Sequence, residues 1–317
     1  MYPSISVIIP VRDRAEVVAR AVRSALAQTL PPDEVIVIDD ASADDTVAAV
    51  EAIDDRRVRL IRHRQRRGAS AARNTGIDTA DGDVLGFLDS DDEWQPGRLA
   101  RQVPQAPDAG LLACGFEVRT GSTRRRAAPG CFRGRTPHRR LLALRGGPIT
   151  TSCLMVDRRT PVASTRFDER LPALQDLDFA IRATDAARFS HVDEVLVTKH
   201  SGAAGRVFTT ENEIAARRLL LELHARELAQ DGPARGAHHL ALARALAGSR
   251  QVAEVAEHLD AAAEAWPGIP SRLAQLSWRS GGVPGLRLSC KVWWFVAEDP
   301  IGRARSVTRS VLRNSDG

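Results

Sequence analysis

The feature that most constrains the fold is a repeated change of hydrophobic period within the first hundred residues. ISVIIPV at 5–11 is continuously apolar, as buried strands are, and apolar residues then recur at helical spacing over 17–26. EVIVID at 34–39 repeats the strand signal, and a second helical pattern covers 47–53. One strand–helix unit therefore follows another.

Two further strands complete this part of the chain. RVRLIR at 57–62 and DVLGFLD at 83–89 are strand-like, and SAARNTGIDTA at 70–80 predicts a short helix between them. Each step from strand to strand has the length of a crossover connection. We therefore predict an α/β fold with a mostly parallel central sheet and helices on both faces.

Polar residues mark where the first two helices are expected to begin. Asp13 is placed to cap the first helix, and Ser42 with Asp45 forms a capping-box pattern before the second. Asp44 is a further candidate for a capping residue. Helix capping is therefore a sufficient explanation for these side chains, without a role in ligand binding.

Carboxylates gather at the expected ligand-binding edge of the sheet. In open α/β sheets ligands bind beyond the carboxyl ends of the strands, and the residues there are Pro10 to Asp13, Asp39, Asp40 and Asp89 to Asp92. A single aspartate at such a place is equally typical of a turn or a helix cap. The run DSDD is different, because its neighbouring carboxylates repel one another unless a cation neutralises them. Oxygen ligands of this kind suit Mg²⁺ or Mn²⁺ beside a diphosphate.

Composition excludes several other classes of protein. The chain has 317 residues, of which 43% are hydrophobic, enough for a full core. Its four cysteines are far apart, which fits neither a disulfide framework nor a zinc site. The apolar run near the N-terminus is too short for a signal peptide or a membrane span, so a cytoplasmic protein is expected, with the inner face of the membrane as an open alternative. Only 4% of the residues are aromatic, which argues against nucleic-acid binding.

Several ordered segments resemble a known family. SVIIPVRDRAEVVARAVRSALAQTLPPDEVIVIDDASADDT and GASAARNTGIDTADGDVLGFLDSDDEWQPGRL are similar to the nucleotide-sugar half of the family-2 inverting glycosyltransferases, which have the GT-A fold. The resemblance covers about residues 4 to 103 well and continues more faintly to about 207. It implies transfer of a sugar from a nucleotide diphosphate sugar, with a UDP-sugar favoured, and a dependence on Mn²⁺ or Mg²⁺.

The resemblance also implies roles for particular residues. Asp176, in LPALQDLDFAIR, matches the general base, and Asp40 is the first choice for recognition of the base of the nucleotide. The residues matched to nucleotide-sugar binding are Pro10, Val11, Arg12, Asp13, Asp39, Asp40, Arg73, Asp89 and Ser90. The residues matched to the metal are Asp91, Asp92 and His200, the last of which is placed near the diphosphate.

Some of these roles have alternatives, and the chain departs from the family at two places. Asp176 could be a solvated acid near a helix start, with Asp178 as the cap, and His200 could be a plain surface residue. Arg12 and Asp13 stand where an aromatic–Asn pair is common, and Gln175 stands where a glutamate is common. The first difference affects base stacking, and the second affects acceptor binding more than chemistry.

The rest of the chain changes in composition. Residues 118–156 contain nine arginines and no acidic residue, typical of a solvated loop or of a segment that attracts an anionic acceptor. Three helical patterns follow, in which His238 and His239 are expected on the helix surface. The segment from Gly285 mixes tryptophans with basic residues, so it either contacts an anionic membrane or packs against the catalytic domain.

These observations give a domain plan and three functional hypotheses. We expect a catalytic domain over 1–207, with a nucleotide-sugar half at 1–103 and an acceptor half at 104–207, and a helical region over 208–317. The favoured function is glycosyl transfer in polysaccharide, cell-envelope or glycoconjugate synthesis, to an acceptor that is lipid-linked or a glycan. A nucleotidyltransferase is disfavoured, because the first strand is not followed by a glycine-rich phosphate loop. A silent sugar-nucleotide-binding scaffold is disfavoured by the presence of both Asp91 and Asp176.

Overall fold

The computed structural model describes residues 2–121, 123–127, 137–145, 149–200, 209–249 and 251–268. The chain divides into two compact units, one from residues 1–138 and 148–206 and the other from residues 139–147 and 207–317. The segment from Gly285 and part of the arginine-rich stretch lie outside the described residues.

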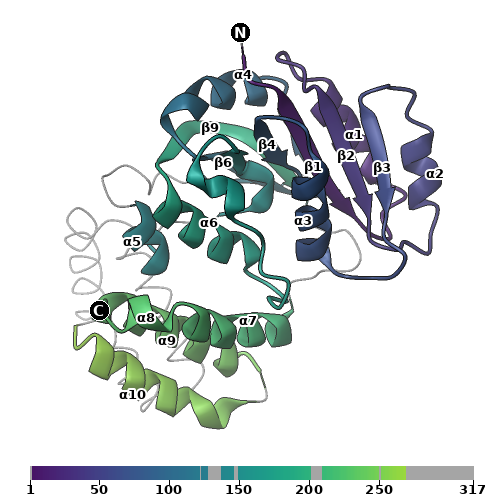
Figure 1. Cartoon of the computed structure of the whole chain (residues 1–317). Helices are drawn as coiled ribbons and strands as arrows, with labels where there is room; N and C mark the ends of the chain where they lie inside the picture. Colours follow the sequence, from purple (N-terminus) through teal and green to yellow (C-terminus); the bar gives the residue numbers. More distant parts are fainter. Residues whose placement is uncertain are drawn as a thin grey trace, which may run out of the picture. The chain divides into compact units, whose positions relative to one another are not determined.

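The first unit is built on one mixed sheet with the strand order β3-β2-β1-β4-β8-β6-β9-β5, to which β7 adds beside β6 (Figure 1). Its strands are β1 (Ile5–Val11), β2 (Glu34–Asp39), β3 (Val58–Arg62), β4 (Val84–Phe87), β5 (Asp92–Trp94), β6 (Leu111–Thr120), β7 (Thr123–Ala127), β8 (Met155–Asp157) and β9 (Phe189–His200). The strands β1 to β4 are parallel to one another, whereas β8 pairs antiparallel with β4 and β6. The predicted α/β class is confirmed.

Helices cover both faces of the parallel half of the sheet, as predicted. The helices of this unit are α1 (Val18–Leu26), α2 (Thr46–Glu51), α3 (Ala69–Thr79), α4 (Arg98–Gln102) and α6 (Gln175–Ala186), with short 3₁₀ turns at Val103–Asp108, Thr151–Cys153 and Pro161–Ser164. Apolar side chains of α1 and α2 join those of alternate residues in β1 and β2 in one core. On the opposite face α3 lies close to β1. Gly76 permits this approach, since a Cβ at that position would stand 2.4 Å from Cγ2 of Ile8.

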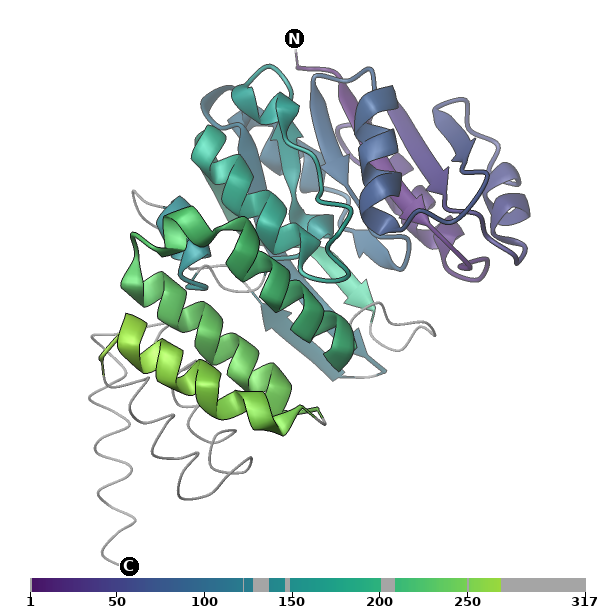
Figure 2. The same ribbon diagram turned by 60° about the horizontal axis from the view of Figure 1, so that its bottom comes forward.

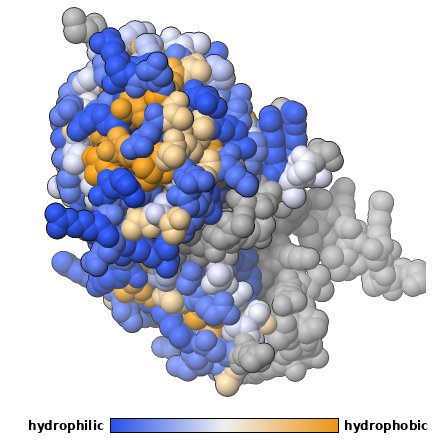
Figure 3. Space-filling model, turned by 90° about the vertical axis from the view of Figure 1, so that its right-hand side faces the viewer, coloured by the Kyte–Doolittle hydropathy of each residue, from blue (hydrophilic) through white to orange (hydrophobic). Residues whose placement is uncertain are grey.

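The edge strand β3 has the half-solvated character that its sequence predicts. Arg59 and Arg62 are exposed, whereas Val58 and Leu60 are half-buried against the core. Figure 3 looks onto this side of the sheet and shows an apolar area bordered by hydrophilic residues. Charged residues on an exposed edge strand oppose pairing with another chain.

The predicted capping roles of Asp13 and Ser42 are wrong, whereas Asp45 does occupy the N-cap position of α2. Helix α1 begins only at Val18, after the N-cap residue Val17, and Asp45 caps α2 by position without a side-chain hydrogen bond. Asp13 lies instead in the left-handed region at φ 49°, and its Oδ1 accepts a hydrogen bond from the amide of Ala43 at 2.8 Å. Ser42 Oγ in turn accepts from the amide of Asp13 at 2.9 Å. The side chains of Asp13 and Ser42 therefore join the loops after β1 and β2 rather than starting helices.

Asp44 comes nearest to the predicted capping role. Its Oδ1 accepts from the amide of Thr46, the first residue of α2, at 3.0 Å. Its Oδ2 accepts from the amide of Ala15 at 3.1 Å, in the loop after β1. This side chain thus serves both the start of a helix and the connection between the two loops.

The second unit is helical. Its described helices are α7 (Thr210–Leu223), α8 (Ala225–Leu228), α9 (Gly232–Ala247) and α10 (Val255–Ala265), with a 3₁₀ turn at Val252–Glu254, and α5 (Pro137–Leu142) lies at its boundary in the sequence. His238 is buried, and its Nε2 lies 3.0 Å from the carbonyl oxygen of Leu142. His239 is half-buried, with its ring against that of His258. The prediction that His238 lies on the helix surface is therefore wrong.

Candidate active site

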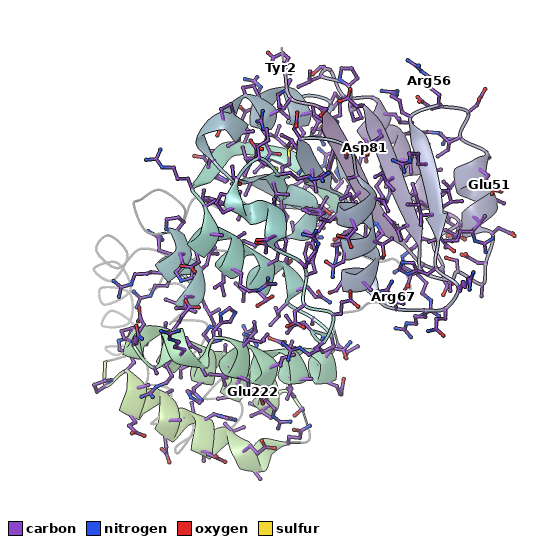
Figure 4. All side chains as sticks on the ribbon, viewed as in Figure 1. Tyr2, Glu51, Arg56, Arg67, Asp81 and Glu222 are labelled. Carbon is purple, nitrogen blue, oxygen red and sulfur yellow. The ribbon has the colours of Figure 1, made fainter. Side chains whose placement is uncertain are left out.

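The carboxyl ends of the parallel strands form one rim of the sheet, which Figure 2 turns toward the viewer. In Figure 4, Arg67 lies at this rim, and Arg56 and Asp81 lie at the opposite one. A pocket of about 430 Å³ also lies at that opposite rim and is lined by both arginine and carboxylate side chains. The groups with the chemistry expected of a transferase lie at the carboxyl rim.

Asp89 follows β4 at this rim and is held between two cations. Arg73 on α3 donates to Oδ1 of Asp89 at 2.7 Å, and Nζ of Lys199 lies 3.7 Å from Oδ2. Burial opposes ionisation of Asp89, but the two cations hold its pKa below the usual range. The structure thus pairs Asp89 with Arg73 and places a lysine beside them, and their roles in nucleotide-sugar binding stay predictions.

Asp92 points into the protein. Its side chain is buried, and its Oδ2 accepts from Ser152 Oγ at 2.6 Å and from Lys199 Nζ at 2.9 Å. Burial raises the pKa of Asp92 to about 6, with a further contribution from the charge of Asp89. These contacts account for Asp92 as a buried partner of Lys199, and its role as a metal ligand stays a prediction.

Asp91 differs from both neighbours. Within the described ranges, its carboxylate forms no hydrogen bond or ion pair with another residue, while Arg20 binds its backbone oxygen at 2.8 Å. Burial and the charge of Asp89 raise the pKa of Asp91. A carboxylate under such repulsion is the group that a cation would stabilise most.

Arg73 carries donors without an acceptor. Its side chain is buried, and neither Nε nor Nη1 has a hydrogen-bond partner in the part of the chain that the structure describes. Its guanidinium lies 5.2 Å from the centre of the Phe167 ring. Because an unpaired buried donor is costly, this arrangement favours an anion that arrives with the ligand.

Asp176 lies in the first turn of α6, and the amide of Leu177 donates to its Oδ1 at 2.9 Å. Burial raises the pKa of Asp176, and the charges of Lys199, Arg73 and Asp89 are near enough to influence it. Asp176 is thus within electrostatic range of the acidic cluster, and its role as the general base stays a prediction.

Asp178 has a different role from Asp176. Its side chain is fully buried and forms an ion pair with Arg182 one turn later in α6. It does not cap the helix, whose N-cap residue is Leu174 in the left-handed conformation. The interpretation of Asp178 as a cap is therefore wrong.

An aromatic cluster and one asparagine hold α6 beside the rim. The rings of Phe167 and Phe179 stack with their centroids 4.3 Å apart, and Phe87 of β4 meets both edge-on. Asn74 on α3 donates to the carbonyl oxygen of Phe167 and accepts from its amide, each at 2.9 Å. The strand that leads to Asp89 and the helix that carries Asp176 are thus packed on the same rings.

The residues expected around the nucleoside lie in the loops after β1 and β2. Asp40 is buried, and its carboxylate accepts from the amides of Arg67 and Gly68 and contacts His63 Nδ1, each at 2.8 Å. Asp39 makes longer contacts, at 3.3 Å to the amide of Ser42 and 3.6 Å to Arg62. The other expected residues are Pro10, Val11 and Ser90, which are buried, and Arg12, which is half-buried beside Asp13.

Lys199 belongs to the cluster although no sequence motif singles it out. Its Nζ donates to Thr150 Oγ1 at 2.7 Å as well as to Asp92. One signal does exist in the composition, since Lys199 and Lys291 are the two lysines in a chain with 45 basic residues. A lysine differs from the surrounding arginines because it presents a compact ammonium group rather than a planar guanidinium.

His200 ends β9, next to Lys199. Its Nε2 lies 3.3 Å from Glu93 Oε2, and its side chain is partly exposed. The contact with Glu93 accounts for its orientation in the structure. Its role near the metal and the diphosphate stays a prediction.

The described residues lack both a preformed metal cluster and a membrane-spanning helix. They contain no group of three or more His, Cys, Asp or Glu side chains arranged to hold a metal ion. None of their helices combines the length and the apolar composition that a membrane crossing requires.

Comparison with known proteins agrees with the geometry of this rim. Residues 6–162 match the family Glycosyl transferase family 2. This region is a family-2 glycosyltransferase domain. The match contains the DSDD segment, Arg73 and the loops after β1 and β2, and it ends before α6 and β9.

Two curated relatives of the family-2 domain match part of the chain. The succinoglycan biosynthesis protein ExoO of Rhizobium meliloti is 45% identical over 108 residues, which are 34% of this chain and 31% of ExoO. The Escherichia coli protein WfaP is named a UDP-Glc:alpha-D-GlcNAc-diphosphoundecaprenol beta-1,3-glucosyltransferase, and it is 36% identical over 99 residues, 31% of this chain and 39% of WfaP. Each match thus spans well under half of the relative's length.

Solved structures share the fold over most of the chain. The S. aureus TarS fragment 1–349 in complex with UDP-GlcNAc gives a TM-score of 0.66 at 17% identity, over 92% of this chain and 91% of the fragment. The mannosyltransferase PcManGT from Pyrobaculum calidifontis, in complex with GDP-Man and Mn²⁺, gives 0.58 at 22% identity, over 94% and 86%. The GT-A-like fold is confirmed.

Proposed function

We propose that this chain transfers a sugar from a UDP-sugar to an acceptor hydroxyl with inversion, in the synthesis of a polysaccharide or cell-envelope glycan. The observation that carries the proposal is the pair of Asp89 and Arg73 at the carboxyl rim of a family-2 domain, with Asp176 near enough for their charges to influence its pKa. Arg73 offers unpaired donors to an anion, and Asp176 offers a carboxylate of raised pKa nearby. Donor binding and proton removal are the two tasks that such a reaction requires.

Asp91 is the residue that would hold a divalent cation. Its unpaired carboxylate oxygens are the hard ligands that Mg²⁺ and Mn²⁺ prefer, so the donor set fits the metal. One protein carboxylate is compatible with such an ion because phosphate oxygens and water supply the rest of its coordination. When bound, the cation would neutralise the charge that develops on the departing diphosphate. The Mn²⁺ in the structure of PcManGT is consistent with this assignment.

The other steps belong to side chains of the chain itself. Arg73 would bind the diphosphate through Nε and Nη1 while its Nη2 remains on Asp89. Asp176 would accept the proton of the acceptor hydroxyl as that oxygen attacks the sugar. Its raised pKa makes it a stronger base than an ordinary aspartate, provided that it is ionised.

We assign recognition of the nucleotide base to Asp39 rather than to Asp40. The three contacts of Asp40 at 2.8 Å hold the loop before α3 and occupy most of the acceptor capacity of its carboxylate. Asp39 is fully buried in the ligand-free chain, but its longer contacts leave its carboxylate more acceptor capacity.

The donor and acceptor classes are proposed from relatives. UDP is favoured because the names of both WfaP and the TarS complex contain a uridine nucleotide. A lipid-linked acceptor is likewise proposed from the name of WfaP. Both classes would meet the chain at the carboxyl rim, where Arg73 and Asp176 lie.

The proposal is tested by ligand-dependent thermal stability. A panel of UDP-, GDP- and dTDP-sugars is screened with Mn²⁺, with EDTA as the reference. We expect a rise in melting temperature with UDP-sugars, since a ligand that binds the folded state stabilises it by mass action. A chain that responds to no nucleotide at millimolar concentration would contradict the proposed function.

A matched variant tests the metal assignment. Asp91→Asn keeps the size of the side chain and removes its charge, so it should abolish the part of UDP binding that depends on Mn²⁺. Asp45→Asn, on an exposed residue before α2, is the control and should bind as the wild type does. Equal Mn²⁺-dependent UDP affinity in both variants would remove Asp91 from the metal site.

A further inference from the structure

Lys199 is fixed in the middle of the acidic cluster. It lies in β9 directly opposite Asp92 of β5 in the antiparallel ladder. Its Nζ donates to Asp92 Oδ2 at 2.9 Å and to Thr150 Oγ1 at 2.7 Å, and it lies 3.7 Å from Asp89 Oδ2. An ammonium group has three N–H donors, and here each has an oxygen near it.

The charge of this lysine is permanent under ordinary conditions. Lysine is ordinarily charged at neutral pH, and the carboxylates of Asp92 and Asp89, 2.9 and 3.7 Å from its Nζ, favour the charged form. Its position does not depend on one flexible contact, because the strand pairing and Thr150 hold it from two sides. Lys199 is therefore a resident cation of the cluster.

Two cations form ion pairs with two of the three carboxylates in DSDD. Arg73 pairs with Asp89, and Lys199 pairs with Asp92 while also approaching Asp89. Asp91 is left as the carboxylate of this run that pairs with no cation among the described residues. An entering divalent ion thus meets one available carboxylate and the positive charge of Lys199 nearby, instead of three carboxylates.

We propose that Lys199 is an internal counter-ion that prevents the acidic cluster from binding a divalent cation without nucleotide. The inference rests on the proposed function and adds an order to it: the metal is held firmly only when a diphosphate supplies further oxygen ligands. Affinity for such cations rises with the number of charged ligands in the site. Lys199 acts through Asp92 and Asp89, so it is a positioning residue.

The test measures Mn²⁺ binding to the full chain by titration calorimetry and by the electron paramagnetic resonance signal of free Mn²⁺. Wild-type protein without nucleotide should bind Mn²⁺ only in the millimolar range. Lys199→Met removes a positive charge from the cluster and takes away the ion-pair partner of Asp92, while Asp89 keeps its pair with Arg73. We therefore expect the Mn²⁺ affinity of this variant without nucleotide to rise about tenfold or more. With UDP present, the difference between the two proteins should shrink.

Two further variants make the result specific. Lys199→Arg keeps the positive charge and should bind Mn²⁺ as weakly as the wild type. Arg166→Met removes a cation from the exposed ion pair with Asp78, changes the net charge by the same amount, and should leave Mn²⁺ binding unchanged. Circular dichroism confirms folding, and Lys199→Gln replaces Lys199→Met if the latter does not fold.

The outcomes separate this inference from the proposed function. Equal or weaker Mn²⁺ affinity in Lys199→Met and Lys199→Gln, or wild-type protein that binds Mn²⁺ as tightly without UDP as with it, would overturn the role of Lys199. Those measurements need neither a sugar donor nor turnover. Failure to bind or use any nucleotide sugar would overturn the proposed function, while the Mn²⁺ affinity of the nucleotide-free variants still decides the inference.

Discussion

At the scale of single residues, Asp176 carries the most direct prediction. Asp176→Asn keeps the shape of the side chain but removes the proton acceptor, so turnover should fall roughly 10²-fold or more. Donor affinity should stay near the wild-type value, because Arg73 and Asp91 are unchanged. UDP release with a saturating acceptor, together with calorimetric UDP affinity, measures both quantities.

The control for Asp176 must leave the core intact. Asp178→Asn is unsuitable, because it breaks a buried ion pair with Arg182 and should destabilise the fold. Asp185→Asn, in the same helix, changes an exposed carboxylate and is the better choice. Turnover retained in Asp176→Asn would show that another group removes the proton.

The raised pKa of Asp176 also predicts the acid side of the pH profile. A general base works only when ionised, so kcat/KM should fall as the pH drops through the pKa of Asp176. Since burial raises that pKa above the ordinary 3.8, the decline should begin at a higher pH than for a solvated aspartate. A pH profile of UDP release that stays flat down to the ordinary range would argue against Asp176 as the base.

The residues of the site are predictable where a local pattern carries them. DSDD stands out because like charges adjoin within four residues, and Asp176 and Arg73 lie in recognisable segments. Lys199 is not predictable in this way, because its partner Asp92 lies 107 residues away and only the β5–β9 pairing brings them together. The same reason explains why the sequence suggests an Asp92 open to a metal, whereas the structure buries it against a lysine.

At the scale of elements, the contacts of Asp40 predict a structural role for this side chain. Its carboxylate holds the loop before α3 through His63 and the amides of Arg67 and Gly68, and Gly68 has φ 96°. Asp40→Ala would leave these donors unpaired and should cost about 2–4 kcal/mol of stability. Urea unfolding measures the loss.

The control for Asp40 is Asp45→Ala, on an exposed residue that makes no side-chain cap bond. It should be nearly as stable as the wild type. If Asp40→Ala kept full stability and lost UDP affinity, the original assignment of Asp40 to base recognition would be restored.

The strands follow from the sequence more accurately than the starts of the helices. Continuous apolar runs predict the bounds of β1 and β2 correctly, because burial on both faces of a parallel sheet imposes such runs. The predicted caps at Asp13 and Ser42 fail because Asp13 bonds to Ser42 and Ala43, which lie 29 and 30 residues away in another loop. Local sequence patterns do not contain such an interaction. The helical periods are sound, and only the capping of the first turns is misplaced.

At the scale of the whole molecule, the helical second unit has its own core and its own expected weakness in acid. Burial lowers the pKa of His238 from its ordinary 6.5 to about 3 and that of His239 to about 4. Both histidines are therefore neutral in the folded chain and become charged in the unfolded chain as the pH falls below 6.5. The unfolded state then binds more protons, so their contribution to stability is complete above that pH and is lost progressively toward the folded pKa values.

This linkage can be measured as a difference between two pH values. By about pH 5 the protonation of His238 in the unfolded chain alone should cost about 2 kcal/mol of unfolding free energy relative to about pH 7. His238→Gln retains a donor for the carbonyl oxygen of Leu142 and cannot titrate, so its loss between the two pH values should be smaller by about that amount. Urea unfolding followed by far-ultraviolet circular dichroism compares the two proteins, and Glu222→Gln, on an exposed residue of α7, serves as the control (Figure 4). The measured quantity is the change in unfolding free energy between the two pH values, so a lower stability of His238→Gln at neutral pH does not affect it. An unchanged acid dependence in His238→Gln would mean that His238 is protonated in the folded chain or already shielded in the unfolded one.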